Sequence, residues 1–213
     1  MMPWFYRLTL AATVLCLVVV VLGAYVRLSD AGLGCPDWPG CYGHLTIPKT
    51  EADIARAEAQ YPERPVEARK AWLEMIHRYV ASLLGFVLII TALLSLRHRN
   101  TRLPTVLPWV LLVAVLIQGT LGMWTVTWLL KPAVVTAHLM GGMTILSLLF
   151  LQTLATRRAL RPDAPSSVPP PHVTAGMRRL GLSALLVLAM QIFLRFVPFW
   201  NKAWPIAPTE SDP

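Results

Sequence analysis

Two histidines lie inside long apolar runs, where an ionisable side chain is uncommon and usually has a function. His77 follows the interfacial residue Trp72 by five positions, and His138 follows Pro132 by six. If both helices enter the membrane from the same side, a rise of about 1.5 Å per residue places both imidazoles about 8–9 Å below one surface. Imidazole is a good iron ligand, and matched depth on two helices suits axial ligation of one planar macrocycle. The pair predicts a haem site, whereas a single histidine is more often a satisfied hydrogen-bonding residue.

Small residues follow both histidines at helical spacing. Ala81 and Gly85 follow the first, and Gly141 and Gly142 follow the second. Such residues let a flat ring approach the helix backbone. They also let membrane helices pack closely without any ligand, so the spacing by itself leaves both interpretations open.

A carboxylate precedes the first histidine. Glu74 lies three residues before His77, so on a helix their Cβ atoms are about 5–6 Å apart. In that position it could take part in proton or oxidation chemistry at the edge of a macrocycle. Arg78 follows Glu74 by four residues, however, and Glu-to-Arg at this spacing is an ordinary helix ion pair. The spacing does not decide between the two roles.

Two of the three cysteines bracket a short loop. Cys35 and Cys41 enclose the sequence Pro-Asp-Trp-Pro-Gly, which is typical of a tight turn. The loop is expected to face an oxidising compartment, which favours a disulfide over free thiols. A zinc site would need ligands beyond Asp37 and His44, and whether the disulfide is structural or redox-active stays open. Cys16, inside an apolar run, is expected to be an ordinary apolar residue.

Membrane-spanning helices must position these residues. Of the 213 residues, 55% are hydrophobic and only 14% are charged, against roughly 25% charged in soluble domains. A run of about 20 apolar residues crosses a bilayer as a helix because its backbone groups are then satisfied within the segment. Five such runs are predicted, at residues 8–25, 79–96 (extended outward to Trp72), 105–130, 133–154 and 180–200. The fold class is all-α integral membrane: a four-helix transmembrane bundle plus a fifth transmembrane helix.

The first run also has some features of a signal peptide, since one arginine precedes it. It is long, however, and it lacks a clear small-x-small cleavage site. Tyr25, Val26 and Arg27 close it. We therefore expect it to remain as a membrane anchor.

The cations indicate an orientation. Arginines gather in the loops at residues 97–102 and 157–179, which the positive-inside rule places in the cytoplasm together with the N-terminus. The loop at residues 28–71 then faces outward, and the chain is a multi-pass protein of a bacterial inner membrane. The net charge of +8 is split among loops, which indicates membrane topology and lipid contact and argues against a nucleic-acid partner.

Three units follow from these patterns. Residues 1–156 form a four-helix haem-binding membrane unit, 157–178 a Pro-rich cytoplasmic linker, and 179–213 a fifth transmembrane helix with an outer tail. Within the outward loop, Thr50 and Asp53 resemble a capping box, which predicts a helix from Thr50 to Gln60. Pro65 then marks the start of the approach to the second span.

Three segments resemble the N-terminal half of the haem A synthase family. They are GAYVRLSDAGLGCPDWPGCYG (residues 23–43), WLEMIHRYVASLLG (72–85) and IQGTLGMWTVTWLLKPAVVTAHLMGG (117–142). The resemblance covers about residues 5–155. It implies a protein built of two similar four-helix halves, an oxidoreductase that converts the C8 methyl of haem O to the formyl of haem A. It also implies a role in cytochrome oxidase biogenesis.

The resemblance assigns roles to the residues singled out above. His77 and His138 match the haem-ligand pair of that half, and Glu74 matches the acid of its E-x-x-H motif, which is implicated in the oxidation. Cys35 and Cys41 match the outer-loop pair that forms a disulfide.

The resemblance also bears on ligands and partners. Haem O is expected as substrate and haem A as product, with haem b as a further candidate ligand. Arg27 and Arg78, at the outer ends of helices, are positioned either to meet haem propionates or to anchor the helices at the interface. Haem O synthase and the assembly of cytochrome oxidase are the expected partners.

The second half of the family, with its own histidine pair for a resident haem b, is not matched. LLVLAMQI (residues 185–192) is similar to the start of that half, and the following FLRFVPFWNKAWPIAPTESDP departs from it. We therefore expect a half-length or truncated form that homodimerises or binds a second half-protein. The alternative function is a bis-histidine haem b protein for electron transfer or haem delivery, without catalysis.

Overall fold

The computed structural model describes residues 2–97, 103–160 and 179, and its helices belong to one compact unit within residues 1–162. The helices in chain order are α1 (Met2–Leu28), α2 (Glu51–Gln60), α3 (Ala68–Leu96), α4 (Leu107–Thr127) and α5 (Pro132–Ala159). The predicted Pro-rich linker and the predicted span at 180–200 lie outside the described residues, and the three-unit division stays a prediction.

Four of these helices are long and apolar enough to cross a membrane: α1, α3, α4 and α5. They correspond to the first four predicted spans, so the all-α membrane fold is confirmed. The structure makes α3 longer at its start than the apolar run alone, because the polar turn from Ala68 to Ala71 continues the same helix.

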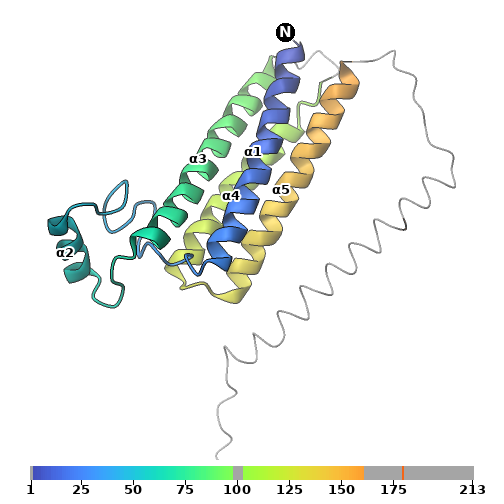
Figure 1. Cartoon of the computed structure of the whole chain (residues 1–213). Helices are drawn as coiled ribbons and strands as arrows, with labels where there is room; N and C mark the ends of the chain where they lie inside the picture. Colours follow the sequence, from blue (N-terminus) through green and yellow to red (C-terminus); the bar gives the residue numbers. More distant parts are fainter. Residues whose placement is uncertain (1, 98–102, 161–178, 180–213) are drawn as a thin grey trace, which may run out of the picture. The chain divides into compact units, whose positions relative to one another are not determined.

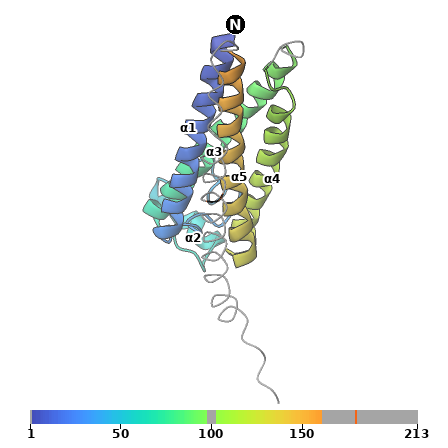
Figure 2. The same ribbon diagram turned by 90° about the vertical axis from the view of Figure 1, so that its right-hand side faces the viewer.

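The long helices form an antiparallel bundle (Figures 1 and 2). Helix α1 packs against α3 and α5, and α4 also packs against α3 and α5. Helices α3 and α5 therefore occupy diagonal positions across the bundle. Helices α1 and α4 end, and α3 and α5 begin, at the end of the bundle that carries α2 (Figure 1). We call this end the loop end.

One stripe of each long helix faces the interior. The buried apolar core in the middle of the bundle contains residues from all four helices: Ala12, Cys16, Leu84, Leu88, Leu111, Ile145 and Leu149. The recurrence at three or four positions is that of one helix face. Many remaining leucines and valines are exposed, as expected for side chains that contact lipid. Helix α1 is an integral part of the bundle, in agreement with the anchor interpretation.

A tight turn joins α4 to α5. The Leu130 N–H donates to the Thr125 carbonyl (2.8 Å), and the Leu129 N–H donates to the Val126 carbonyl (3.1 Å). This is the bonding pattern of a Schellman motif. Leu129 and Leu130 adopt positive φ values of 52° and 55°, and the Leu130 side chain packs on Gly32 of the preceding loop. The turn between α4 and α5 therefore also holds the segment that follows α1 against the bundle.

Helix α2 begins as its sequence predicts. The Thr50 hydroxyl accepts from the Asp53 N–H (3.1 Å) and donates to the Asp53 carboxylate (2.7 Å). The bond from Thr50 lowers the pKa of Asp53. The predicted helix between Thr50 and Gln60 is confirmed.

Candidate functional site

His77 rests on a glycine of the neighbouring helix. It lies in the first three turns of α3 and is partly buried. A Cβ atom placed on Gly23 of α1 would lie 3.0 Å from the His77 Cε1 atom and 3.5 Å from its Nε2. The backbone of Val19, one turn earlier in α1, also interacts with the imidazole. The ring thus occupies the groove between α3 and α1.

His138 has an equivalent environment in the other helix pair. It lies near the start of α5 and is also partly buried. A Cβ atom on Gly122 of α4 would lie 3.2 Å from the His138 Cε1 atom. The backbone of Gln118, one turn earlier in α4, interacts with the imidazole. Each histidine is therefore seated on the helix that precedes its own in the bundle.

Both histidines leave a ring nitrogen without a protein partner. The Nδ1 atoms of His77 and His138 are buried and accept or donate no hydrogen bond. Buried polar atoms are nearly always paired, so such an atom is expected to have a partner outside the chain, either a ligand or an ordered water. The two imidazoles come from the diagonal helices α3 and α5, each near the start of its helix at the loop end. Among the described residues, no cluster of three or more His, Cys, Asp or Glu side chains could hold a bare metal ion.

Gln118 connects α4 to the backbone beside the second histidine. Its Nε2 donates to the His138 carbonyl (2.5 Å). The same amide lies over the Gly141 and Gly142 backbone, where a Cβ on Gly141 would collide with its Oε1 atom. The spacing of these glycines left ring access and close packing both open, and the space over Gly141 is filled by the Gln118 amide.

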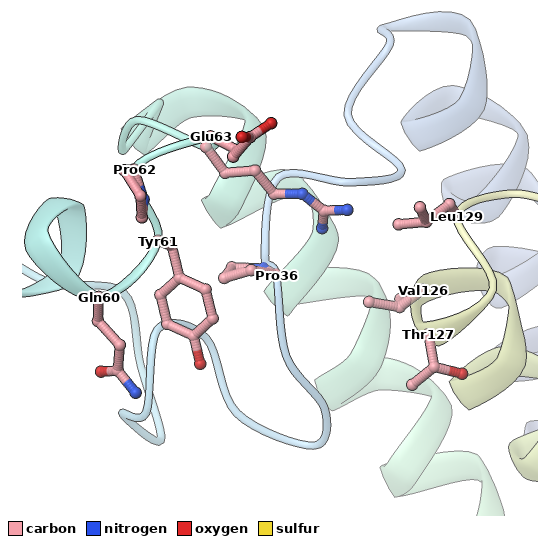
Figure 3. A pocket seen from close by; sticks show the side chains of 9 residues that line it. Pro36, Gln60, Tyr61, Pro62, Glu63, Val126, Thr127 and Leu129 are labelled. Carbon is pink, nitrogen blue, oxygen red and sulfur yellow. The ribbon is translucent and has the colours of Figure 1, made fainter.

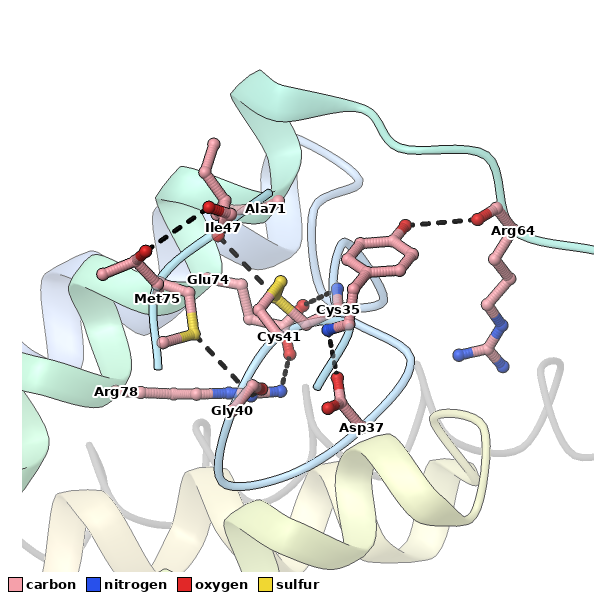
Figure 4. The surroundings of a disulfide bond; sticks show 12 residues. Cys35, Asp37, Gly40, Cys41, Ile47, Arg64, Ala71, Glu74, Met75 and Arg78 are labelled. Carbon is pink, nitrogen blue, oxygen red and sulfur yellow. Dashed lines mark hydrogen bonds and ion pairs between the residues drawn. A yellow bond between two sulfur atoms is a disulfide. The ribbon is translucent and has the colours of Figure 1, made fainter. Parts of the chain in front are cut away.

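Glu74 joins α3 to the cysteine loop. Its side chain is only 6% exposed, and its Oε1 lies 2.6 Å from the Arg78 Nη2. Its Oε2 accepts the backbone N–H of Cys35 at 3.0 Å. The ion pair that the helical spacing allows is thus present, but it is buried, and both partners also hold the loop (Figure 4).

The two candidate arginines differ in their surroundings. Arg78, with a side chain 12% exposed, donates from Nη1 to the carbonyls of Pro39 (3.3 Å) and Gly40. It therefore binds the loop that lies between the cysteines. Arg27 is exposed at the end of α1, and its side chain makes no hydrogen bond or ion pair within the described part of the chain.

Cys35 and Cys41 form a disulfide, as predicted. Both are fully buried and pack on Ala71 and Met75 of α3. A tight turn closes the loop, because Cys41 and His44 exchange two backbone hydrogen bonds of 2.8 and 3.1 Å. The disulfide thus lies against the turn of α3 that precedes His77.

Asp37 stabilises this loop from within, and Tyr42 connects it to the stretch that follows α2. The Asp37 carboxylate accepts the N–H groups of Tyr42 (2.6 Å) and Gly43 (2.7 Å), so Asp37 supports a turn. The Tyr42 hydroxyl donates toward the carbonyls of Arg64 (3.3 Å) and Pro65 (3.2 Å). Burial raises the pKa of Tyr42, which keeps this donor protonated.

A cavity of about 350 Å³ lies away from the histidines. It is lined by residues of the disulfide loop, of the end of α2 and the stretch after it, and of the end of α4 and the turn after it (Figure 3): Pro36, Gln60, Tyr61, Pro62, Glu63, Arg64, Val126, Thr127 and Leu129. None of the predicted site residues is among them.

Comparison with known proteins places this arrangement in a family. The model of the COX15-CtaA family, described as cytochrome oxidase assembly protein, matches residues 6–194. The chain belongs to the COX15-CtaA family. The match extends beyond the four described spanning helices into the region of the fifth predicted span.

Curated relatives within the family carry the name haem A synthase. The protein of Shewanella oneidensis is 44% identical over 193 residues, which cover 91% of this chain and 55% of that protein. The protein of Geobacillus kaustophilus is 30% identical over 154 residues, or 69% of this chain and 42% of that protein. The chain thus spans about half the length of the curated relatives it matches.

Sequence reasoning did not find three residues of this COX15-CtaA site. Gly23 and Gly122 contact the imidazoles from other helices, which spacing along one helix cannot reveal. Gln118 carried a usable signal, since a polar amide inside an apolar run needs a partner.

The loop that the Cys35–Cys41 disulfide closes gives a first prediction. In protein isolated without reductant, Cys35 and Cys41 are expected to resist alkylation until a reductant is added, because they are bonded to each other. Cys16 is buried and free, and should react after denaturation alone. Mass mapping of alkylated peptides measures both. Free thiols at Cys35 and Cys41 in native membranes would contradict the pairing.

Proposed function

We propose that this chain is a haem A synthase-type oxidoreductase that acts on haem O. Membership of the COX15-CtaA family and the relatives named haem A synthase support the reaction class. The observation that carries the proposal is the pair of buried, unpartnered Nδ1 atoms of His77 and His138 in an apolar bundle.

In this proposal, His77 and His138 would hold the haem iron through their imidazole rings. The residues fit such a group, since imidazole is a good iron ligand. The ring itself supplies the remaining iron ligands, so a site with two protein ligands is sufficient. Arg27, whose donors are free of partners among the described residues, is proposed to meet a propionate. Arg78 would have to release the loop to do so.

The bound haem O would be oxidised at its C8 methyl group. Overall, the methyl group and one water molecule would give the formyl group, four protons and four electrons, with the electrons passed one at a time through a second redox centre to an external acceptor. Protons must leave during this change, and Glu74 is proposed to accept them as a base near the reacting edge. Glu74 lies one helical turn from His77, on the side toward the loop end.

We also propose the orientation that the arginines indicate. Arg157 and Arg158 lie in the last turn of α5, at the end of the bundle opposite the disulfide. The positive-inside rule places this end and the N-terminus in the cytoplasm. The disulfide loop then faces an oxidising compartment, which is compatible with a stable Cys35–Cys41 bond.

A second haem-bearing half is the proposed partner. The four described spanning helices offer one histidine pair, whereas oxidation of a substrate haem is expected to pass electrons to a second centre, such as haem b. A second copy of this chain or a separate half-protein would supply it. Haem O synthase and the cytochrome oxidase assembly machinery are the proposed source and destination of the haem.

Co-expression with a source of haem O tests the proposed activity. Extracted haems, separated by chromatography, should contain haem A when this chain and its second half are present, and none when the chain is absent. A stable, reversible one-electron couple without any haem conversion would instead support the alternative, a bis-histidine haem b carrier or delivery protein.

A further inference from the structure

Each histidine ring packs on a glycine of the neighbouring helix, Gly23 or Gly122, and we call this packing surface the seat of the ring. The two seats repeat one arrangement. Gly23 precedes the last residue of α1 by five positions, and Gly122 precedes the last residue of α4 by five. In each helix, the backbone group that interacts with the imidazole lies four residues before the glycine. The two seats therefore lie at corresponding heights, at the ends of the two helices that terminate at the loop end.

The contacts distinguish these glycines from ordinary packing glycines. A glycine that serves close helix packing faces the backbone of its neighbour. At Gly23, the three atoms nearest to an added Cβ all belong to the His77 imidazole, at 3.0–3.6 Å. At Gly122, all three belong to the His138 imidazole, at 3.2–3.9 Å. Each glycine thus leaves room for a ring and not for a helix.

We propose that Gly23 and Gly122 are positioning residues that hold the two imidazoles in the orientation required for ligation. This inference rests on the proposed haem ligation and adds to it what sets the angle of each ring. A methyl group at either position would press on Cε1 and tilt the ring. Functional constellations tolerate only about 0.5 Å and 10–20° of displacement.

Gln118 makes the second seat the stiffer of the two. Its amide holds the His138 carbonyl, so the backbone of α5 cannot readily retreat from a larger residue at Gly122. The imidazole must move instead. Gly122→Ala is therefore the more informative substitution.

The chain offers a matched control in the same helix. Gly119 lies three residues before Gly122, and an added Cβ there would meet no atom within 4 Å. Gly119→Ala thus makes the same chemical change in α4 without touching a ring. It should leave haem binding unchanged and raise the Tm slightly, because alanine favours the helix.

The test compares Gly122→Ala, Gly119→Ala and His138→Ala in the purified 213-residue chain in detergent. Haem titration and absorption and electron paramagnetic resonance spectra are recorded for each. Gly122→Ala should bind haem about 10–100-fold more weakly, the usual cost of disturbing the support of a metal ligand. It should also lose part of its low-spin bis-imidazole signal, whereas Gly119→Ala should match the unsubstituted protein.

A double-mutant cycle, with the melting temperature (Tm) of haem-free protein as its readout, tests the contact between Gly122 and His138 independently. If Gly122→Ala presses on the ring, it should lower the Tm when His138 is present and lose this effect in the His138→Ala background. A Tm loss that is equal in both backgrounds would overturn the inference. The inference would also be overturned if Gly122→Ala and Gly23→Ala failed to fold while Gly119→Ala folded. The two glycines would then serve helix packing.

The outcomes separate this inference from the proposed function. If His138→Ala loses the bis-imidazole spectrum while Gly122→Ala keeps both spectrum and affinity, the ligation stands and the positioning role is wrong. If His138→Ala keeps the spectrum of the unsubstituted protein, the proposed ligation itself is wrong.

Discussion

Purified protein loaded with haem is expected to show the spectrum of a low-spin bis-imidazole iron, and alanine at either His77 or His138 should abolish that signature. Each imidazole has a buried ring nitrogen without a protein partner, and the two rings belong to the diagonal helices α3 and α5. Loss of one ring leaves the iron with one protein ligand. The remaining haem should then become five-coordinate and high-spin, or dissociate.

His44→Ala is the control for this experiment. His44 lies in the disulfide loop, where its backbone pairs with Cys41, so its side chain can be removed without changing the bundle. Absorption spectra, haem-to-protein ratios and circular dichroism should be measured for all three variants. The proposed ligation is wrong if both the His77→Ala and the His138→Ala variants retain the unsubstituted spectrum at an unchanged haem content.

The bundle could be predicted because the bilayer restricts the choices. A long apolar run must be a helix in lipid, and the four described spans follow these runs. The capping pair Thr50 and Asp53 is local in sequence, so the start of α2 could also be read. The disulfide was predictable because Cys35 and Cys41 are close in sequence and bracket turn-forming residues.

The seats of the histidines could not be predicted in the same way. Contacts of His77 with Gly23 and of His138 with Gly122 depend on which helices become neighbours, and one sequence does not state that order. Gly141 shows the limit well. Its small size was compatible with an approaching ring or with close helix packing, and in the structure the space over it is filled by the Gln118 amide.

Glu74 was only half predictable for a related reason. The pair with Arg78 follows from helical spacing, but the bond from the Cys35 N–H to Glu74 joins residues 39 positions apart. This long-range bond changes the question asked of Glu74. Its carboxylate is a point of attachment for the disulfide loop as well as a candidate base.

Two roles of Glu74 therefore predict different results for Glu74→Gln. If it serves only the loop, breaking a buried ion pair costs about 3–5 kcal/mol of stability. The loop should then loosen, and haem content and product should fall together. If it is also a base at the reacting edge, the amide retains an oxygen that can accept the Cys35 N–H but cannot take a proton. Product formation should then fall by about 10²–10⁴-fold.

We expect the second result for Glu74→Gln, with haem bound, a nearly normal spectrum, and haem O or its alcohol accumulating in place of haem A. Arg78→Gln breaks the same ion pair and also releases the Gly40 carbonyl, so it reports the effect of a loosened loop. Haem chromatography from cells with the second half present gives the product, and alkylation of Cys35 and Cys41 under mild reductant gives the state of the loop. Normal haem A from Glu74→Gln would exclude the base, and an equal loss from Arg78→Gln would assign Glu74 to the loop alone.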